Sequence, residues 1–352
     1  MRARSRKGAP GIVEVAKRAG VSPATVSRFF NEPEIVKGKT RNLIEQAARD
    51  LGYYRNRIAT TDQHGFSGTI GLIVPTIDNA IFAELIQAFS SRLLSHDRTM
   101  LIAAHGYKPS LEVGIVKSLL ERRIDGVALI GFEHEKAPLE MLAARGVPVL
   151  AAWNYRKDSP IPCIGADNFQ VGFVAAQHLM KMGHRDVALV FPPTQSNDRA
   201  EDRLNGVLHA LDMDLSQLSD NRFIETRYDI GEAKQAIIKM LCENRPSAII
   251  CGNDVIAQGA VYACQSLGIN IPDDVSIIGI GDFRGSSQME PGLTTVRMPA
   301  QRIAEQAADL LCGGLSVTSV KGTTRIKIDS ELVIRKSVKD ISSHKNTERL
   351  LR

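Results

Sequence analysis

The chain has 352 residues, of which 43% are hydrophobic and 24% are charged, and its formal net charge is +5. This length is sufficient for two or three globular domains. The 5 cysteines lack C-x-x-C pairing, so we expect neither a zinc site nor a disulfide framework. No apolar run is long enough to cross a bilayer, and no signal peptide follows the basic start. We therefore expect a cytoplasmic protein without a membrane segment.

The positive charge is concentrated at the start of the chain. Residues 1–60 contain 13 Lys and Arg against 5 Asp and Glu, whereas the remainder has a net charge of −3. A basic head on a mildly acidic body is typical of a nucleic-acid-binding module attached to a domain with another task. Residues 1–10 precede any periodic pattern, and we interpret them as a flexible basic tail.

Residues 13–28 predict two short helices joined by a tight turn, which is a helix-turn-helix. The first helix places Val13, Ala16 and Lys17 at helical spacing, and Gly20 supplies the turn. Ser22 is the expected N-cap of the second helix, and Pro23 its first residue. The expected inner face of this pair contains Val21, Val26 and Phe29 or Phe30. The side chains left to face a DNA major groove and its phosphates are Ser22, Ala24, Thr25, Ser27 and Arg28.

A third helix is predicted over residues 40–51, because Leu43, Ile44, Ala47, Ala48 and Leu51 recur at helical spacing and Gly52 follows them. Residues 11–56 therefore form a DNA-binding domain. Periodicity is lost over residues 57–68, which we interpret as a hinge or linker. Residues 69–336 form the body of the protein, and residues 337–352 form a polar C-terminal tail.

From residue 69 onwards, short β-branched runs alternate with helical stretches, which indicates parallel sheets. Residues 160–165 interrupt the series near its middle, so we expect two similar α/β lobes with a cleft between them. The predicted strands are residues 70–74, 100–104, 127–130, 147–151, 187–191, 248–251 and 275–280.

Ligands bind doubly wound sheets outside the carboxyl ends of the strands, so the residues just after each run are candidate site residues. They are all polar or charged side chains: Asp78, Asn79, His134, Asp167, Asn168, Arg199, Arg203, Asn253, Asp254 and Asp282.

Several motifs are weak singly and specific together. In the head they are Glu14-Val15-Ala16, Val21-Ser22, Thr25-Val26-Ser27-Arg28 and Leu51-Gly52-Tyr53. In the body they include Ile70-Gly71-Leu72-Ile73-Val74-Pro75, Gly183-His184-Arg185, Gly252-Asn253-Asp254 and Ile271-Pro272-Asp273-Asp274. On these residues the chain resembles the lactose-repressor (LacI/GalR) family of bacterial transcription regulators, from about Ile12 to Arg335. Residues 27–31, 105–109 and 289–291 are most similar to the gluconate-repressor branch.

The resemblance implies an α/β protein with a three-helix head and a two-lobed, periplasmic-binding-protein-like domain built on two parallel sheets. It also implies a homodimer on a palindromic operator of double-stranded DNA, with a small metabolite between the lobes that relieves repression. Arg28 is the direct-readout candidate, because a guanidinium can bond a guanine edge bidentately. Pro23 and Ala24 occupy the family's other specificity positions. Residues expected to bind phosphates are Ser22, Thr25, Ser27, Asn31, Arg55 and Asn56, although Thr25 or Ser27 can equally be simple helix-surface residues.

The connector departs from the family pattern. Arg55 stands where family members usually have proline, and Asp62 stands where they have a leucine that wedges into the minor groove. A carboxylate there would face phosphates, so Asp62 should not intercalate. We expect a short or weakly formed hinge helix, with Arg55, Asn56 and Arg57 compensating through phosphate contacts.

In the cleft, the resemblance implies that Asp167, Arg203 and Asn253 hold the ligand. Asp167 can instead be only a strand-end cap, and Arg203 only a partner for Asp202 or Glu201. His134 occupies a pocket position of the family, but it can also be an ordinary surface histidine. The remaining implied contacts are an apolar floor of Ile81 and Phe82, walls of Asn79, Arg199 and Tyr228, and the strand-end residue Asp282.

Gly281 stands where many sugar-binding family members have an aspartate that receives ligand hydroxyls. Loss of that negative charge beside Arg203 and Arg199 favours an anion, because an arginine fork pairs well with a carboxylate. The sequence therefore predicts a sugar acid, such as a gluconate-like acid, rather than a neutral sugar.

Two other classes of protein remain to be weighed. Residues 279–285 approximate a dinucleotide fingerprint, which would suit an NAD-dependent dehydrogenase, but the motif is late in the chain and runs into Glu290-Pro291-Gly292. A periplasmic-type solute-binding protein would share the two-lobed cleft but needs an export signal. No nucleophile with its base, metal-ligand cluster or Walker loop is evident, so we expect no enzyme, no metal and no cofactor.

Overall fold

The computed structural model describes residues 10–54, 66–219, 221–313 and 323–342. The chain divides into two compact units, of which the first ends at Ser67 and the second begins at Gly68. Within the described ranges, no helix is both long and apolar enough to span a membrane. The predictions for Arg55, Asn56, Arg57 and Asp62 fall outside the described residues, as do those for residues 1–9 and 343–352.

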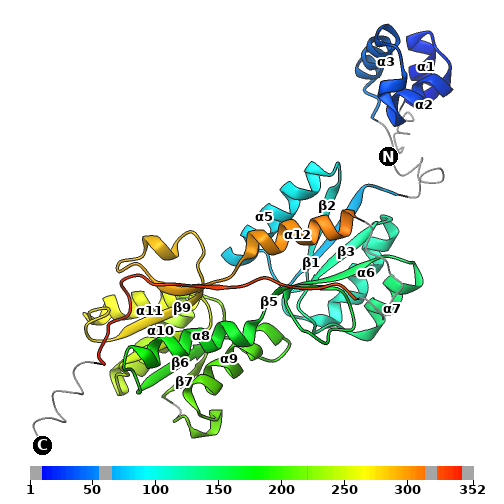
Figure 1. Cartoon of the computed structure of the whole chain (residues 1–352). Helices are drawn as coiled ribbons and strands as arrows, with labels where there is room; N and C mark the ends of the chain where they lie inside the picture. Colours follow the sequence, from blue (N-terminus) through cyan, green and yellow to red (C-terminus); the bar gives the residue numbers. More distant parts are fainter. Residues whose placement is uncertain (1–9, 55–65, 220, 314–322, 343–352) are drawn as a thin grey trace, which may run out of the picture. The chain divides into compact units, whose positions relative to one another are not determined.

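The first unit is a three-helix head with a short 3-10 turn (Figure 1). Its elements are α1 Ile12–Ala19, α2 Pro23–Asn31, η1 Pro33–Ile35 and α3 Gly38–Leu51. The predicted start of the second helix is confirmed: the Ser22 side chain accepts a hydrogen bond from the Thr25 amide at 3.2 Å, and Pro23 is the first helical residue. The turn requires Gly20, whose φ is +67°.

Of the three residues placed at helical spacing in α1, Ala16 is buried, whereas Val13 is 60% exposed and Lys17 is exposed. The buried face of α1 consists of Val15, Ala16 and Ala19, which pack in one core with residues of α2 and α3. In α3, Ile44, Ala47 and Ala48 are buried as expected, but Leu43 is exposed.

The second unit contains two six-stranded sheets. The first sheet has the order β11-β5-β4-β3-β1-β2 and all of its strands are parallel. We call the part of the chain built on it lobe 1. Its strands are β1 Thr69–Val74, β2 Thr99–Ala104, β3 Gly126–Ile130, β4 Val149–Asn154, β5 Cys163–Ala166 and β11 Arg325–Lys327.

The second sheet, the basis of lobe 2, has the order β12-β10-β9-β8-β6-β7. It is parallel except for β12, which pairs antiparallel with β10. Its strands are β6 Val187–Phe191, β7 Phe223–Glu225, β8 Ala248–Cys251, β9 Ser276–Gly281, β10 Thr294–Arg297 and β12 Glu331–Val333. The chain therefore passes between the lobes after β5, after β10 and between β11 and β12.

Helices cover both faces of each sheet, as the alternation of buried side chains requires. In lobe 1, Ile70 and Leu72 pack on the side of α5 and α12, whereas Ile73 packs with α6 and α7. In lobe 2, α8 and α9 share one core and α10 and α11 the other. The helices are α5 Ala80–Ser95, α6 Glu112–Glu121, α7 Lys136–Ala144, α8 Asn168–Lys181, α9 Asp198–Leu211, α10 Ile230–Glu243, α11 Asp254–Leu267 and α12 Ala300–Cys312.

The predicted fold class is confirmed, and all seven predicted strands are present. The prediction that residues 160–165 interrupt the series is wrong, because Cys163–Ala166 forms β5 inside the first sheet. The fourth strand was predicted over residues 147–151. In the structure it is β4 Val149–Asn154, which begins two residues later and ends three residues later. One of the three added residues is Asn154, whose side chain donates a hydrogen bond to Asp198 Oδ2 at 3.0 Å.

Helices α8 and α9 pack closely because each has a glycine at the crossing. An added Cβ on Gly206 would overlap the Phe169 carbonyl oxygen, and one on Gly172 would overlap that of Arg203. This close approach fixes Arg203, on α9, against the start of α8.

We predict that Gly206→Ala lowers the unfolding free energy by about 1–3 kcal/mol, because the methyl group forces two backbones apart. Gly114→Ala is the matched control: Gly114 lies on α6 with nothing within 4 Å of its added Cβ. Alanine there should be neutral or stabilising by up to about 1 kcal/mol. Urea unfolding of both variants measures this, and equal effects would contradict the packing argument.

Candidate functional site

The first candidate site is the outer surface of α2 in the head. Ser22, Pro23, Ala24 and Arg28 are exposed there, and Thr25, Ser27 and Asn31 are half-buried. The Ser22 and Thr25 hydroxyl oxygens are 2.9 Å apart, so these two side chains cap the helix while reaching its surface. Val26 and Phe29 hold the opposite face in the core. The arrangement presents one long cation, Arg28, among small polar and apolar side chains.

The second candidate site is a cavity of 910 Å³ between the two lobes. Lobe 1 contributes the segment that follows β1, including Asn79, and Gly106 and Tyr107 after β2. Lobe 2 contributes Asn197, Tyr228 and Gln258 among others. The cavity thus lies where parallel α/β sheets place ligands. Of the nine side chains predicted to bind an effector, Asn79 lines this cavity, and so does the additional wall residue Tyr228.

Arg203 is buried behind this cavity, at 5% exposure. Its Nη1 donates to Asn168 Oδ1 and its Nη2 donates to the Tyr228 hydroxyl, both at 3.2 Å. Its Nε has no hydrogen-bond partner among the described residues. The partners of Arg203 are therefore Asn168 and Tyr228, and not Asp202 or Glu201, which the sequence left open as alternatives. The side chain is therefore a buried cation held by neutral oxygens.

Arg199 has a different environment, because its Nη1 pairs with Asp198 Oδ1 at 2.8 Å. The same guanidinium donates to the Ile130 carbonyl of lobe 1 and to Asn197 Oδ1, at 3.2 and 3.1 Å. All of these bonds lie within the chain and consume both terminal nitrogens. The geometry thus gives Arg199 a role in joining the lobes.

Asp198, the first residue of α9, is the centre of this junction. Its Oδ2 accepts hydrogen bonds from the Phe132 amide at 2.9 Å and from Asn154 Nδ2 at 3.0 Å, both of lobe 1. Its own amide donates to Glu133 Oε2 at 2.9 Å. Burial raises the pKa of the Glu133 carboxyl, and the bond from the Asp198 amide opposes that rise. We name these contacts, together with the Arg199 bonds, the lobe junction.

His134 faces away from the cavity into lobe 1. Its Nδ1 lies 2.8 Å from Glu112 Oε1, and its Nε2 lies 3.2 Å from the Gly131 carbonyl oxygen. His105 lies on the other side of the same carboxylate, with its Nε2 3.8 Å away, and burial lowers the pKa of His105. Both ring nitrogens of His134 are occupied, so the structure places this side chain in support of the loop after β3.

Asp167 and Asn253 are helix caps in the structure. Asp167 accepts a hydrogen bond from the Gln170 amide at 3.1 Å and pairs with Lys327 at 3.4 Å. Asn253 accepts one from the Ile256 amide at 3.0 Å and is 4% exposed. For Asp167 this is the strand-end cap that the sequence left open as an alternative.

Asp282 is held by two ion pairs, to Arg297 at 2.7 Å and to Arg335 at 2.6 Å. Its amide donates to Asp254 Oδ2, and Asp254 also accepts from Ser286 and Thr295. Burial raises the pKa of Asp254 to about 6 in spite of these three bonds. Both carboxylates are therefore occupied by groups of lobe 2. Residues 286–288 after this segment form a 3-10 turn, not the long helix that a dinucleotide fingerprint opens.

The expected apolar floor lies in the core of lobe 1. Ile81 and Phe82 are 7% and 4% exposed, and the Phe82 ring packs edge-on against Trp153 at 5.4 Å. Gly281 comes close to this floor: its φ is +142°, and an added Cβ would lie 3.1 Å from Ile81 Cδ1. An aspartate at this position would be strained as well as crowded.

The sequence reasoning missed the residues that carry the lobe junction and one cavity wall. Asn154 was missed because the fourth strand was predicted to end at residue 151. Asp198 was missed because only Arg199 and Arg203 of the same segment were predicted to bind a ligand. Tyr107 was quoted as part of a motif but not as a site residue. Among the described residues, no cluster of His, Cys, Asp or Glu is arranged to hold a metal ion.

Comparison with known proteins identifies both units. Residues 11–56 match the model of bacterial regulatory proteins of the lacI family, and residues 176–338 match that of the periplasmic binding protein-like domain. The chain thus combines a lacI-family head with a periplasmic binding protein-like body. The lacI-family match covers α1 to α3, and the second match covers lobe 2 and the last crossings between the lobes.

Proteins similar to this chain are transcriptional regulators. The HTH-type transcriptional repressor PurR of Salmonella arizonae is 29% identical over 332 residues, covering 94% of this chain and 97% of its own. The lac repressor dimer bound to operator and the anti-inducer ONPF has a TM-score of 0.79 at 26% identity, over 94% of this chain and all of that one. Transcription regulator GntR from Chromobacterium violaceum has a TM-score of 0.69 at 25% identity, over 76% of this chain and 98% of that one.

We predict that Asp198→Asn weakens the lobe junction, because an amide cannot accept from Arg199 and from the Phe132 amide at once. Hydrogen exchange at the Phe132 amide should become about tenfold faster or more, as for loss of a bond to a buried charge. The control is Asp202→Asn. Asp202 also accepts from Asn154 at 3.0 Å, but its side chain is 27% exposed, so water can replace the contact. Equal acceleration in the two variants would contradict a special role for Asp198.

Proposed function

We propose that the chain is a cytoplasmic, non-enzymatic repressor that binds a palindromic operator as a homodimer and changes its operator affinity when a small anion, a sugar acid, binds between the lobes. The lacI-family head and the repressor relatives support the DNA-binding part. The observation that carries the effector part is the buried Arg203 guanidinium, which no carboxylate of the described residues neutralises.

The free energy of burying a charge explains why an anion is favoured. An arginine taken out of water is stabilised by a paired carboxylate, and Arg199 has one in Asp198. Arg203 has only the amide oxygen of Asn168 and the hydroxyl of Tyr228. An effector carboxylate would supply the missing charge. The resemblance of residues 27–31, 105–109 and 289–291 to the gluconate-repressor branch supports a sugar acid as its carrier.

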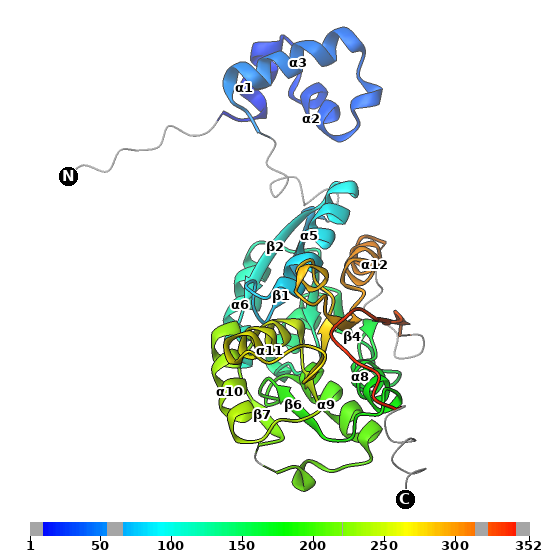
Figure 2. The same cartoon turned by 90° about the vertical axis from the view of Figure 1, so that its left-hand side faces the viewer.

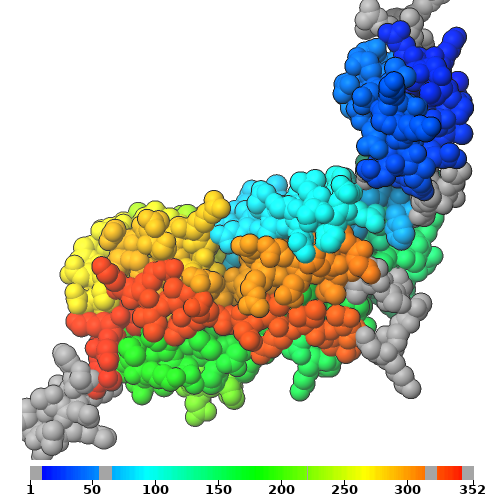
Figure 3. All heavy atoms as spheres, turned by 45° about the horizontal axis from the view of Figure 1, so that its top comes forward, coloured from blue at the N-terminus to red at the C-terminus, as the bar shows by residue number. Residues whose placement is uncertain are grey.

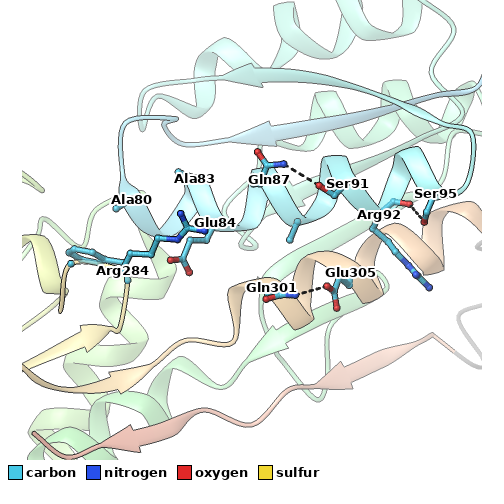
Figure 4. Close-up of a pocket in the computed structure, with 13 residues that line it drawn as sticks. Ala80, Ala83, Glu84, Gln87, Ser91, Arg92, Ser95, Arg284, Gln301 and Glu305 are labelled. Carbon is cyan, nitrogen blue, oxygen red and sulfur yellow. Dashed lines mark hydrogen bonds between the residues drawn. The ribbon is translucent and has the colours of Figure 1, made fainter. Parts of the chain in front are cut away.

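The dimer is supported by the face formed by α5 and α12, which lie side by side in both ribbon views (Figures 1 and 2). Arg92 of α5 and His96, the residue that follows this helix, both bind Asp309 of α12, at 2.6 and 2.7 Å, which holds the two helices together. Figure 3 shows the atoms of these two helices next to each other on one face of the molecule. A groove of 880 Å³ is lined by residues of both helices and by the segment Phe283–Gly285 (Figure 4). We propose a second copy of the chain as its occupant, as the dimeric lac repressor suggests.

For the DNA-binding part we predict that Arg28→Ala lowers operator affinity by about 1–3 kcal/mol, with the loss confined to sequences that have the preferred base at one position of each half-site. Operator sequences are first selected from random duplexes with the native chain. Lys136→Ala, a change of an exposed lysine in lobe 1, is the control and should leave affinity unchanged. A uniform loss over all sequences would assign Arg28 to phosphate binding instead.

The test of the effector part is calorimetric titration with a panel of sugars and sugar acids, D-gluconate included, followed by operator binding with any hit. We predict that an acid binds and that Arg203→Lys weakens it at least about tenfold, because an ammonium cannot reproduce the bidentate fork. Tight binding of a neutral hexose, with no acid bound, would refute the anion assignment and leave the DNA-binding role intact.

A further inference from the structure

Two tyrosines, one from each lobe, stack against each other in the wall of the cavity. The rings of Tyr107 and Tyr228 are stacked, with centroids 5.9 Å apart and planes inclined by 30°. Tyr107 is brought there by a tight turn in which Gly106 and Tyr107 both have positive φ and the Lys108 amide donates to the His105 carbonyl at 3.0 Å. A tyrosine is an uncommon residue at positive φ, so the turn holds it in this position at a cost.

Tyr228 separates the cavity from Arg203. Both tyrosines and Asn197 line the cavity, whereas Arg203 does not and is 5% exposed. The Tyr228 hydroxyl oxygen accepts from Arg203 Nη2 and from Asn197 Nδ2, each at 3.2 Å. One neutral oxygen therefore serves two donors, one of them cationic.

The arginine is incompletely satisfied by this arrangement. Nε and Nη2 form one edge of a guanidinium, the edge that binds the two oxygens of a carboxylate side by side. Here Nη2 meets the phenol oxygen while Nε has no partner among the described residues. A bond of 3.2 Å is longer than the 2.7–2.9 Å typical of charge-assisted pairs. An acceptor stronger than the phenol oxygen could therefore bind Nε and Nη2 of Arg203.

We propose that Tyr107 and Tyr228 form a gate over Arg203, and that the Tyr228 hydroxyl holds the place of a carboxylate oxygen of the effector until the effector displaces it. The gate rests on the proposed function, since it needs an acid that binds Arg203. Tyr228 is then a built-in competitor of the effector.

The gate selects for charge. A neutral sugar that displaces Tyr228 exchanges one hydroxyl for another on Nη2 and gains little. A carboxylate occupies Nε and Nη2 together and neutralises a buried cation, which compensates for unstacking the two rings. The tyrosine hydroxyl thus sets a threshold that acids pass and neutral sugars do not.

The direction in which Tyr228→Phe changes gluconate affinity distinguishes this role from direct ligand binding. Full-length native chain, Tyr228→Phe and Tyr54→Phe are titrated calorimetrically with D-gluconate and D-glucose at constant ionic strength. Tyr228→Phe keeps the stacked ring but removes the competitor, so gluconate affinity should rise about three- to tenfold. Tyr54→Phe, which removes one hydroxyl from a tyrosine of the head that is 89% exposed, is the control and should leave affinity unchanged.

A weaker affinity in Tyr228→Phe would overturn the proposal, because it would make the hydroxyl a ligand contact. Equal affinities of native chain and Tyr228→Phe would overturn the placeholder alone and leave the acid-sensing function standing. Binding of no acid by any of the three proteins would overturn both. Matching circular dichroism and melting curves confirm that each variant is folded.

The stacking contact is tested separately by kinetics. Tyr107→Ala removes the ring from lobe 1 and should speed gluconate association at least about threefold, since entry no longer requires unstacking. Trp153, the sole tryptophan of the sequence, packs against Phe82 in lobe 1 and provides a fluorescence signal. Unchanged association in Tyr107→Ala would contradict a gate.

Discussion

The carboxylate of Asp198 lies at the contact between the lobes, where it replaces the water that would otherwise solvate three donors. The Phe132 amide and Asn154 approach it from lobe 1, and Arg199 from lobe 2. A buried charge is stabilised only when its partners are complete, and here completion requires that the lobes be together. The carboxylate of Asp198 therefore links the two sheets that bound the cavity.

The two arginines of α9 show how different hydrogen-bond partners give similar buried side chains different roles. Arg199 and Arg203 are one helical turn apart and each is 5% exposed. Arg199 is neutralised by Asp198 and reaches the Ile130 carbonyl, so its binding capacity is used within the protein. Arg203 is restrained by Asn168 and Tyr228 without being neutralised. Helix α9 thus carries one arginine that is paired with a carboxylate and one that is bound only by neutral oxygens of the described residues.

The head achieves a comparable division with much less buried surface. Val15, Ala16, Val26 and Ile44 form its core, while the polar side chains of α2 lie outward. The N-cap Ser22 serves both purposes, since it satisfies the Thr25 amide and lies at the end of α2 that the family directs into the groove. In the two-lobed unit, Arg203 is held in place between residues of α8 and the segment before α10, whereas in the head the exposed Arg28 lies on a domain of only three helices.

The sequence by itself determined the order of seven of the twelve strands of the described sheets, whereas β5, β7, β10, β11 and β12 were not predicted. Alternating runs of β-branched and helical residues locate strands to within a few residues because the periods of 2 and 3.6 are local properties of the chain. Caps such as Ser22 and Asp167, and the turn at Gly20, were readable for the same reason. The family motifs added the head and the two-lobed body.

Tertiary structure decided what the strand-end residues do. His134, Asp167 and Asp282 were all placed at strand ends, but each is bound by a side chain that is distant in the sequence: Glu112, Lys327 and Arg297. The junction at Asp198 and the stacking of Tyr107 on Tyr228 join residues 44 and more positions apart. Such contacts depend on how two sheets pack, and packing depends on the whole chain.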